Sequence, residues 1–137
     1  MTNKPDTQNT PSPTASASEL PAQEIKTLVT SGRGLSIASV DDKSTPLCSY
    51  APYYQAYGKF YLLLSGLAEH CDNIARQKKA SLMIMENENQ VANIFARKRL
   101  SLHCMSREIA RSAPVWRNLT EKMEAPLGPR LGVLRAL

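Results

Sequence analysis

The chain has 137 residues, of which 42% are hydrophobic, and a formal net charge of +5. This length allows one domain and excludes a full (β/α)8 barrel of about 250 residues, while the apolar content excludes a wholly disordered chain. The longest apolar stretch, Tyr61 to Ala68, is shorter than the about 20 residues that cross a bilayer, and the first residues lack the apolar run of a secretory signal. We therefore expect no membrane partner.

The three cysteines, Cys48, Cys71 and Cys104, form no C-x-x-C pair. An odd number of thiols without a secretory signal predicts reduced cysteines and a cytoplasmic protein. Scattered thiols are typical of small buried hydrophobic side chains, so we predict no metal site. The positive charge is spread over several segments without a nucleic-acid-binding motif, so we also predict no nucleic-acid partner.

The first part of the chain changes from a polar tail to alternating segments. Residues 1–22 are rich in Ser, Thr, Asn, Gln and Pro, a composition typical of disorder. A helix is predicted from Ala22 until the run 31–34, which contains two glycines, ends it. Residues 35–40 predict a strand, and residues 47–55 predict a second one that Pro52 bends or confines to an edge.

The apolar period changes in the middle of the chain. The nearly continuous apolar run 60–64 is typical of a strand buried on both faces. Leu67, Cys71 and Ile74 then recur at the i, i+4, i+7 spacing of a short helix. Residues 80–85 return to a strand pattern.

The last part of the chain predicts one more strand, at 96–105, and then a helix. Ser112 is expected to cap this helix, and Pro114 lies in its first turn, where a missing N–H costs little. Trp116, Leu119 and Met123 give the helix an apolar stripe. The order of elements favours a mainly β fold, an antiparallel sheet or barrel with peripheral helices.

The densest charge is the run Arg97-Lys98-Arg99. In a strand, Arg97, Arg99 and His103 share one face, whereas Lys98 points to the other. Two arginines two residues apart can hold a phosphate or a carboxylate. The alternative is a solvated strand face.

Two other groups of residues also leave alternatives open. His70 and Asn73 share one face of the predicted helix, where they bind an anionic ligand group or are ordinary surface residues. Six of the eight aromatic residues lie between positions 50 and 61. Tyr50 and its neighbours either stack on a planar cofactor or form core and subunit contacts.

Four segments of the chain carry a resemblance to a known family. They are residues 49–52, 65–73, 80–83 and, most specifically, the run Phe-Ala-Arg-Lys-Arg-Leu at 95–100. Together they resemble the haem-utilisation proteins of the HugZ/HutZ type, a branch of the pyridoxamine 5′-phosphate oxidase-like, FMN-binding split-barrel superfamily. The resemblance implies a six-stranded split β-barrel and a homodimer with cofactor sites at the subunit contacts. It also implies haem binding, with haem breakdown for iron release in some members.

The resemblance further implies which residues bind the cofactor, although it leaves the catalytic residues unassigned. These cofactor-binding residues are Ser49, Tyr50, His70, Asn73, Arg97, Lys98 and Arg99.

The sequence departs from the flavin-binding members of the superfamily. Those members carry an Arg and a Lys where this chain has Ser49 and Tyr54, and an Arg-Lys pair where it has Glu69 and His70. A carboxylate repels a phosphate dianion, and each lost charge-assisted hydrogen bond is worth about 1.5–3 kcal/mol. We therefore expect weak FMN binding and no pyridoxamine phosphate oxidation. An FMN-dependent oxidoreductase remains the alternative to a haem protein.

A second departure concerns the C-terminal end. Haem-utilisation members continue after the last helix with two more strands and a histidine that ligates the iron. Residues 127–137 end where that segment begins, and no histidine follows His103. We therefore expect a split-barrel domain at 23–126, a truncated C-terminal segment at 127–137 without closing strands, and weak or no haem turnover.

Overall fold

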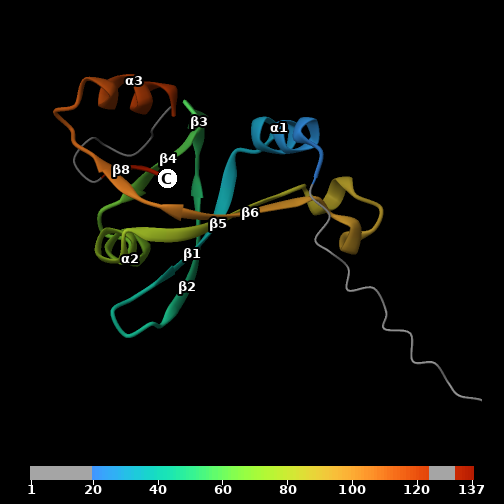
Figure 1. Ribbon diagram of the computed structural model, residues 1–137, viewed down its shortest axis with the longest axis horizontal. Helices are drawn as coiled ribbons and strands as arrows, with labels where there is room; N and C mark the ends of the chain where they lie inside the picture. The colour runs from blue at the N-terminus through green and yellow to red at the C-terminus, as the bar shows by residue number, and fades with distance from the viewer. Residues whose placement is uncertain (1–19, 124–131) are drawn as a thin grey trace, which may run out of the picture.

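The computed structural model describes residues 20–123 and 132–137 (Figure 1). Most of the predicted tail 1–22, and residues 127–131 of the predicted C-terminal segment, lie outside the described residues. The elements in chain order are α1 (Ala22–Ser31), β1 (Gly34–Val40), β2 (Pro46–Pro52), β3 (Tyr54–Ala56), β4 (Lys59–Ser65), α2 (Glu69–Gln77), β5 (Lys79–Met85), η1 (Glu88–Gln90), η2 (Ile94–Ala96), β6 (Arg99–Met105), β7 (Arg107–Ile109), α3 (Pro114–Lys122) and β8 (Gly132–Ala136).

The strands form two antiparallel sheets, with the orders β2-β1-β5-β6 and β3-β4-β8-β7. One residue, Tyr53, separates β2 from β3, and one residue, Ser106, separates β6 from β7. Each of these pairs is therefore one bent strand that takes part in both sheets. Counted in this way, the described strands form six continuous strands. The bend after Pro52 confirms the sequence prediction. The fold is a mainly β split barrel, as the resemblance implies.

The central strands of the sheet β3-β4-β8-β7, β4 and β8, are buried on both faces. Leu62 and Leu64 of β4 point into the core beneath the other sheet, while Tyr61 and Leu63 pack in a second core with Leu119 of α3. All four β4 residues are buried, which confirms the strand predicted from the apolar run.

Strand β8 lies between β4 and β7 in this sheet. Its Leu134 is fully buried in the second core, and its residues pair with Tyr61 to Ser65 of β4. The expectation that residues 127–137 contribute no closing strand is therefore wrong for 132–136. The short run around Val133 and Leu134 gave too little periodicity to predict a strand.

The sheet β2-β1-β5-β6 is covered on one face only. Its inner residues, such as Ile37 and Leu82, are buried in the main core, where Ile74 of α2 joins them. None of its outward-pointing residues is buried. We call this outer surface the open face; its residues are Gly34, Ser36, Ala38, Val40, Pro46, Cys48, Tyr50, Pro52, Lys79, Ser81, Met83, Met85, Arg99, Ser101, His103 and Met105.

Two predicted helix details are wrong. Leu67 is 82% exposed and lies before α2, because the backbone amide of Ala68 bonds to the Ser65 carbonyl in a turn that delays the helix. Ser112 does not cap α3, whose N-cap position is Ala113. Pro114 at the first helical position is confirmed. Within the described residues, none of the helices is long and apolar enough to cross a membrane.

The predicted strand 96–105 begins only at Arg99. Residues 94–96 form a 3₁₀ turn instead, because the side chain of Asn93 accepts a hydrogen bond from the Phe95 amide. Arg97 therefore precedes the strand and does not share its face. Arg99 and His103 do share an exposed face, as predicted.

Candidate functional site

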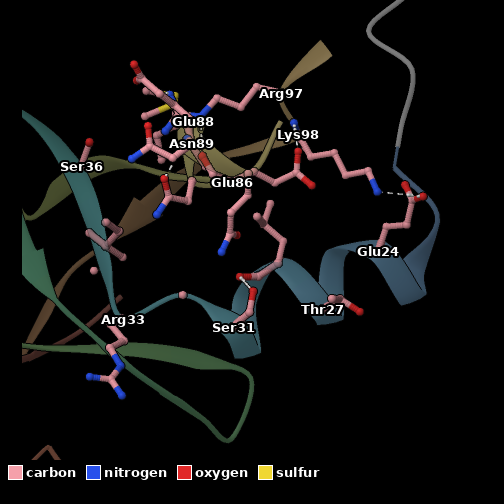
Figure 2. Close-up of a pocket in the computed structure, with 18 of the residues that line it drawn as sticks. Glu24, Thr27, Ser31, Arg33, Ser36, Glu86, Glu88, Asn89, Arg97 and Lys98 are labelled. Atoms are coloured by element: carbon pink, nitrogen blue, oxygen red, sulfur yellow. Dashed lines mark hydrogen bonds and ion pairs between the residues drawn. The ribbon is translucent and has the colours of Figure 1, made fainter. Parts of the chain in front are cut away.

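A polar groove of about 940 Å³ lies between α1, the start of β1 and the connection that follows β5 (Figure 2). Tyr50, Arg97 and Lys98 line it, so the structure brings three of the seven predicted site residues to one groove. We call it the α1 groove. Figure 1 shows that α1 and the 86–98 connection, which supply most of its lining, lie on the same side of the molecule.

Of the three cations that line the α1 groove, Arg33, Arg97 and Lys98, the last two are already paired with carboxylates. Lys98 Nζ lies 3.2 Å from Glu24 Oε1 of α1, and the Lys98 backbone amide donates to Glu86 Oε2 at 2.8 Å (Figure 2). Arg97 donates to the Glu86 carbonyl oxygen, and its Nη1 lies 3.7 Å from Glu88 Oε2. An anion that entered here would compete with these carboxylates, so the groove is balanced in charge rather than cationic. The sequence shows the acidic residues but not this pairing.

Arg99 lies outside the α1 groove, on the open face opposite Met85 of β5. Its side chain is exposed. Tyr50 belongs to the open face as well and is 67% exposed, so it links the two surfaces. Its ring lies against Gly34, where an added Cβ would come within 1.8 Å of the Tyr50 hydroxyl oxygen. A glycine is therefore required there for this ring position.

Ser49 and His70 meet on the inner side of the sheet. His70 Nδ1, at the start of α2, lies 2.9 Å from Ser49 Oγ of β2. Burial lowers the pKa of His70 below its ordinary value of 6.5, so its uncharged form is favoured. The first turn of α2 also holds Glu69 and Asp72, which disfavour an anionic ligand at this helix end.

Asn73 is turned away from solvent. It is 5% exposed, and its amide donates a hydrogen bond to Ser39 Oγ of β1 at 3.2 Å. This contact fixes α2 to the sheet. In the described structure Asn73 therefore has a structural partner, and its ligand role stays a prediction.

A second groove, of about 370 Å³, lies on the open face around His103. We call it the His103 groove; it is lined mostly by apolar side chains together with Lys79, Ser81 and His103. His103 Nδ1 lies 2.7 Å from Ser81 Oγ, its cross-strand neighbour. His103 lies on the face of Arg99, as predicted from the sequence, but its pairing with Ser81 was not predicted. The β5–β6 register, which no local pattern fixes, creates it.

The three cysteines are free thiols in different surroundings. Cys71 is buried, and burial raises the pKa of its thiol. Cys104 is half-buried, and burial raises its thiol pKa too. Cys48 is exposed on the open face, which corrects the expectation that all three are buried. Over residues 20–123 and 132–137, no three His, Cys, Asp or Glu side chains are grouped to hold a metal ion.

No model of a known protein family matches the chain. Among curated proteins, the haem oxygenase HutZ of Vibrio cholerae is 31% identical over 109 residues. The match covers 80% of this chain and 60% of HutZ, so the chain spans less than two thirds of the length of that relative.

Solved structures share the fold. The crystal structure of HutZ from Vibrio cholerae, described as a haem storage protein, has a TM-score of 0.75 and 27% identity and covers 83% of this chain and 86% of its own. ChuZ of Campylobacter jejuni has a TM-score of 0.70 at 22% identity, over 82% of this chain and 50% of its own. A haem-binding protein of Mycobacterium smegmatis has a TM-score of 0.70 at 18% identity, over 83% and 49%.

Proposed function

We propose, on the premise that this chain is a split-barrel protein of the HugZ/HutZ type, that it binds haem and serves haem utilisation. The observation that carries the proposal is the 31% identity to the haem oxygenase HutZ over 80% of the chain. The fold shared with the HutZ crystal structure, at 27% identity, supports it.

The open face fits such a ligand. Haem presents a flat apolar macrocycle and two carboxylates. The open face offers an apolar groove beside His103, the aromatic ring of Tyr50, and the cations Lys79 and Arg99. Apolar lining with a few well-placed polar groups is typical of a cofactor site.

We assign the predicted site residues different roles. Arg99 and Tyr50 contact haem on the open face, since both are exposed there. Arg97 and Lys98, which are paired with carboxylates, position the start of β6. Ser49, His70 and Asn73 hold α2 against the sheet and thereby support the face from behind.

We extend the proposal to haem breakdown for iron release in the cytoplasm. When bound, haem supplies an iron centre at which a reductant and O₂ react. The residues of this chain bind the macrocycle, shield one of its sides from water and hold its carboxylates. Turnover would be measured as biliverdin-like product and released iron.

We also propose a homodimer. The open face exposes apolar side chains that include Tyr50 at 67% and Met105 at 74%. An exposed apolar surface of this kind marks a contact with another molecule. A second copy of the chain would cover bound haem from its other side. Sedimentation velocity tests this directly, since a monomer with haem saturated would contradict it.

The alternative, an FMN-dependent oxidoreductase, receives no support from the site. The end of α2 that would face a flavin phosphate begins with Glu69 and carries Asp72 in the same turn. These carboxylates oppose a phosphate dianion. We therefore expect a colourless protein after purification, without a flavin spectrum.

A haem titration of the full chain, followed by Soret absorbance with FMN titrated in parallel, tests the proposed function. We expect saturable haem binding and no saturable FMN binding. The Arg99→Ala variant should bind haem about tenfold more weakly, because a charge-assisted hydrogen bond is worth about 1.5–3 kcal/mol.

The Arg117→Ala variant is the matched control for the Arg99 experiment. It also removes one exposed arginine, but from α3, which packs through Leu119 against the other sheet. It should bind haem like the unaltered chain. Saturable FMN binding without haem binding would contradict the proposal and support the flavin alternative. Equal losses of haem affinity in the two variants would mean that the net charge of the protein, and not the position of Arg99, determines haem binding.

A further inference from the structure

We propose that His103 Nε2 is the protein ligand of the haem iron in this chain, an assignment that rests on the proposed haem function. The chain has two histidines, His70 and His103. Both are hydrogen-bonded through Nδ1 to a serine, but only His103 lies in an apolar groove on the open face.

The Ser81 contact gives the His103 ring the orientation that a metal ligand needs. Ser81 Oγ lies 2.7 Å from His103 Nδ1 and can accept the proton that this nitrogen carries. A histidine that binds a metal through one ring nitrogen commonly donates the N–H of the other to an oxygen. With Nδ1 occupied in this way, Nε2 keeps its lone pair for the iron.

The surroundings of His103 suit a macrocycle with acidic side chains. Ala38, Val40 and Pro46 line the groove, and their apolar side chains suit contact with the apolar macrocycle of a porphyrin. Lys79 lies at the same groove, diagonal to His103 across the β5–β6 pair, and offers its ammonium to a carboxylate. The groove is a shallow half-site, which agrees with the proposal that a second copy covers it.

Two other donors, His70 and Cys48, are less suited. His70 is half-buried on the inner side of the sheet, and Glu69 precedes it on the helix. Cys48 is exposed on the open face, but it is not among the residues that line the His103 groove. Thiolate ligation gives a different Soret spectrum from imidazole ligation, so the two can be distinguished.

The test compares the Soret spectra in haem titrations of the unaltered full chain, of His103→Ala and of His70→Ala, which replaces the other histidine of the sequence. We expect the unaltered chain and His70→Ala to share one Soret position and one spin state by electron paramagnetic resonance. His103→Ala should bind about tenfold or more weakly and show a shifted Soret band. Free imidazole added to the His103→Ala complex should restore the original spectrum.

Ser81→Ala tests the positioning role of the serine. Loss of an outer hydrogen bond to a ligating histidine typically costs about 10- to 100-fold in metal affinity. We expect weaker haem binding with the imidazole type of spectrum retained, whereas Ser81→Thr, which keeps the hydroxyl, should restore affinity. Both side chains lie on an exposed face, and a circular dichroism melt of each variant checks that the fold is unchanged.

The outcomes separate this inference from the proposed function. If His103→Ala binds haem with an unchanged affinity and spectrum, the ligand assignment is wrong and the haem function stands. If His70→Ala loses the spectrum instead, His70 is the ligand and the assignment is again wrong. If the unaltered chain binds no haem, the proposed function fails and the assignment fails with it.

Discussion

The two sheets of the barrel differ in how many of their faces the chain itself covers. The sheet β3-β4-β8-β7 is packed on both sides, because Leu62 and Leu64 of β4 enter one core and Tyr61 and Leu63 the other. The sheet β2-β1-β5-β6 is packed on its inner side only. The doubly covered sheet therefore contributes mainly to stability, while the half-covered sheet leaves a surface available for a ligand or a partner.

The largest expected effect comes from opening a cavity in the doubly covered sheet. Leu62→Ala removes a fully buried side chain and should lower the free energy of unfolding by about 2–5 kcal/mol. The matched control is Met105→Ala on the open face, where the side chain is 74% exposed and the change should stay within about 0.5 kcal/mol. Urea denaturation measures both. Equal losses would mean that the two sheets do not differ as described.

A buried charge in β8 tests whether the doubly covered sheet tolerates polar groups. The Arg135 side chain is 5% exposed, and its Nη2 lies 3.6 Å from Glu108 Oε2. Its Nη1 donates to Ser106 Oγ at 3.4 Å, and among the described residues its Nε has no hydrogen-bond partner. The guanidinium is thus only partly satisfied.

We expect substitutions of the two partners to act with opposite signs. Glu108→Ala leaves the buried guanidinium without its charged partner and should cost about 1–3 kcal/mol in unfolding free energy. Arg135→Met fills a similar volume without a charge and should be neutral or stabilising. Urea denaturation again decides, and a loss for Arg135→Met as large as for Glu108→Ala would show that the ion pair itself stabilises the strand.

The helix that covers the inner side of the half-covered sheet should make stability depend on pH. Because burial lowers the pKa of His70 below 6.5, the unfolded chain binds a proton there more readily than the folded chain. This contribution is fully present above about pH 6.5, and it decreases as the pH falls below that value towards the lower pKa of the folded chain.

Thermal melts at pH 7.5 and pH 5.5 measure this contribution. The unaltered chain should lose more stability between the two values than His70→Gln, whose side chain remains polar but does not titrate. A larger loss in His70→Gln would mean that the folded chain holds the His70 proton more tightly than the unfolded chain does.

Local patterns predicted the elements whose signal lies within one segment. The alternation over β1 and β5, the double burial of β4 and the stripe of α3 around Leu119 are all confirmed. Two features were not predicted, because a single side-chain hydrogen bond determines one of them and pairing with distant strands determines the other. The turn that precedes Arg99 depends on the Asn93 side chain, and β8 is defined by pairing with strands far away in the sequence.

The candidate site shows the same division. The sequence identified Arg97 and Lys98 as candidates, but the carboxylate of Glu24 that meets Lys98 comes from a helix more than seventy positions earlier. Likewise, Ser81 and His103 become neighbours only through the β5–β6 register. Candidate site residues can therefore be predicted from the sequence, whereas the partners that neutralise or orient them are set by how the strands and helices come together in the fold.

The smallest expected effect tests where the Tyr50 ring lies on the open face. Gly34 has no left-handed backbone conformation, so an alanine there is free of backbone strain and should stabilise the strand by about 0.4–1 kcal/mol through the unfolded state. In the unaltered chain the added methyl meets the Tyr50 ring, which must move, and the gain should be lost. In a Tyr50→Ala background the gain should return. A double-mutant cycle of unfolding free energies in urea measures this coupling. If the effects of the two substitutions are additive, the Tyr50 ring does not contact Gly34 and lies away from the boundary between the open face and the α1 groove.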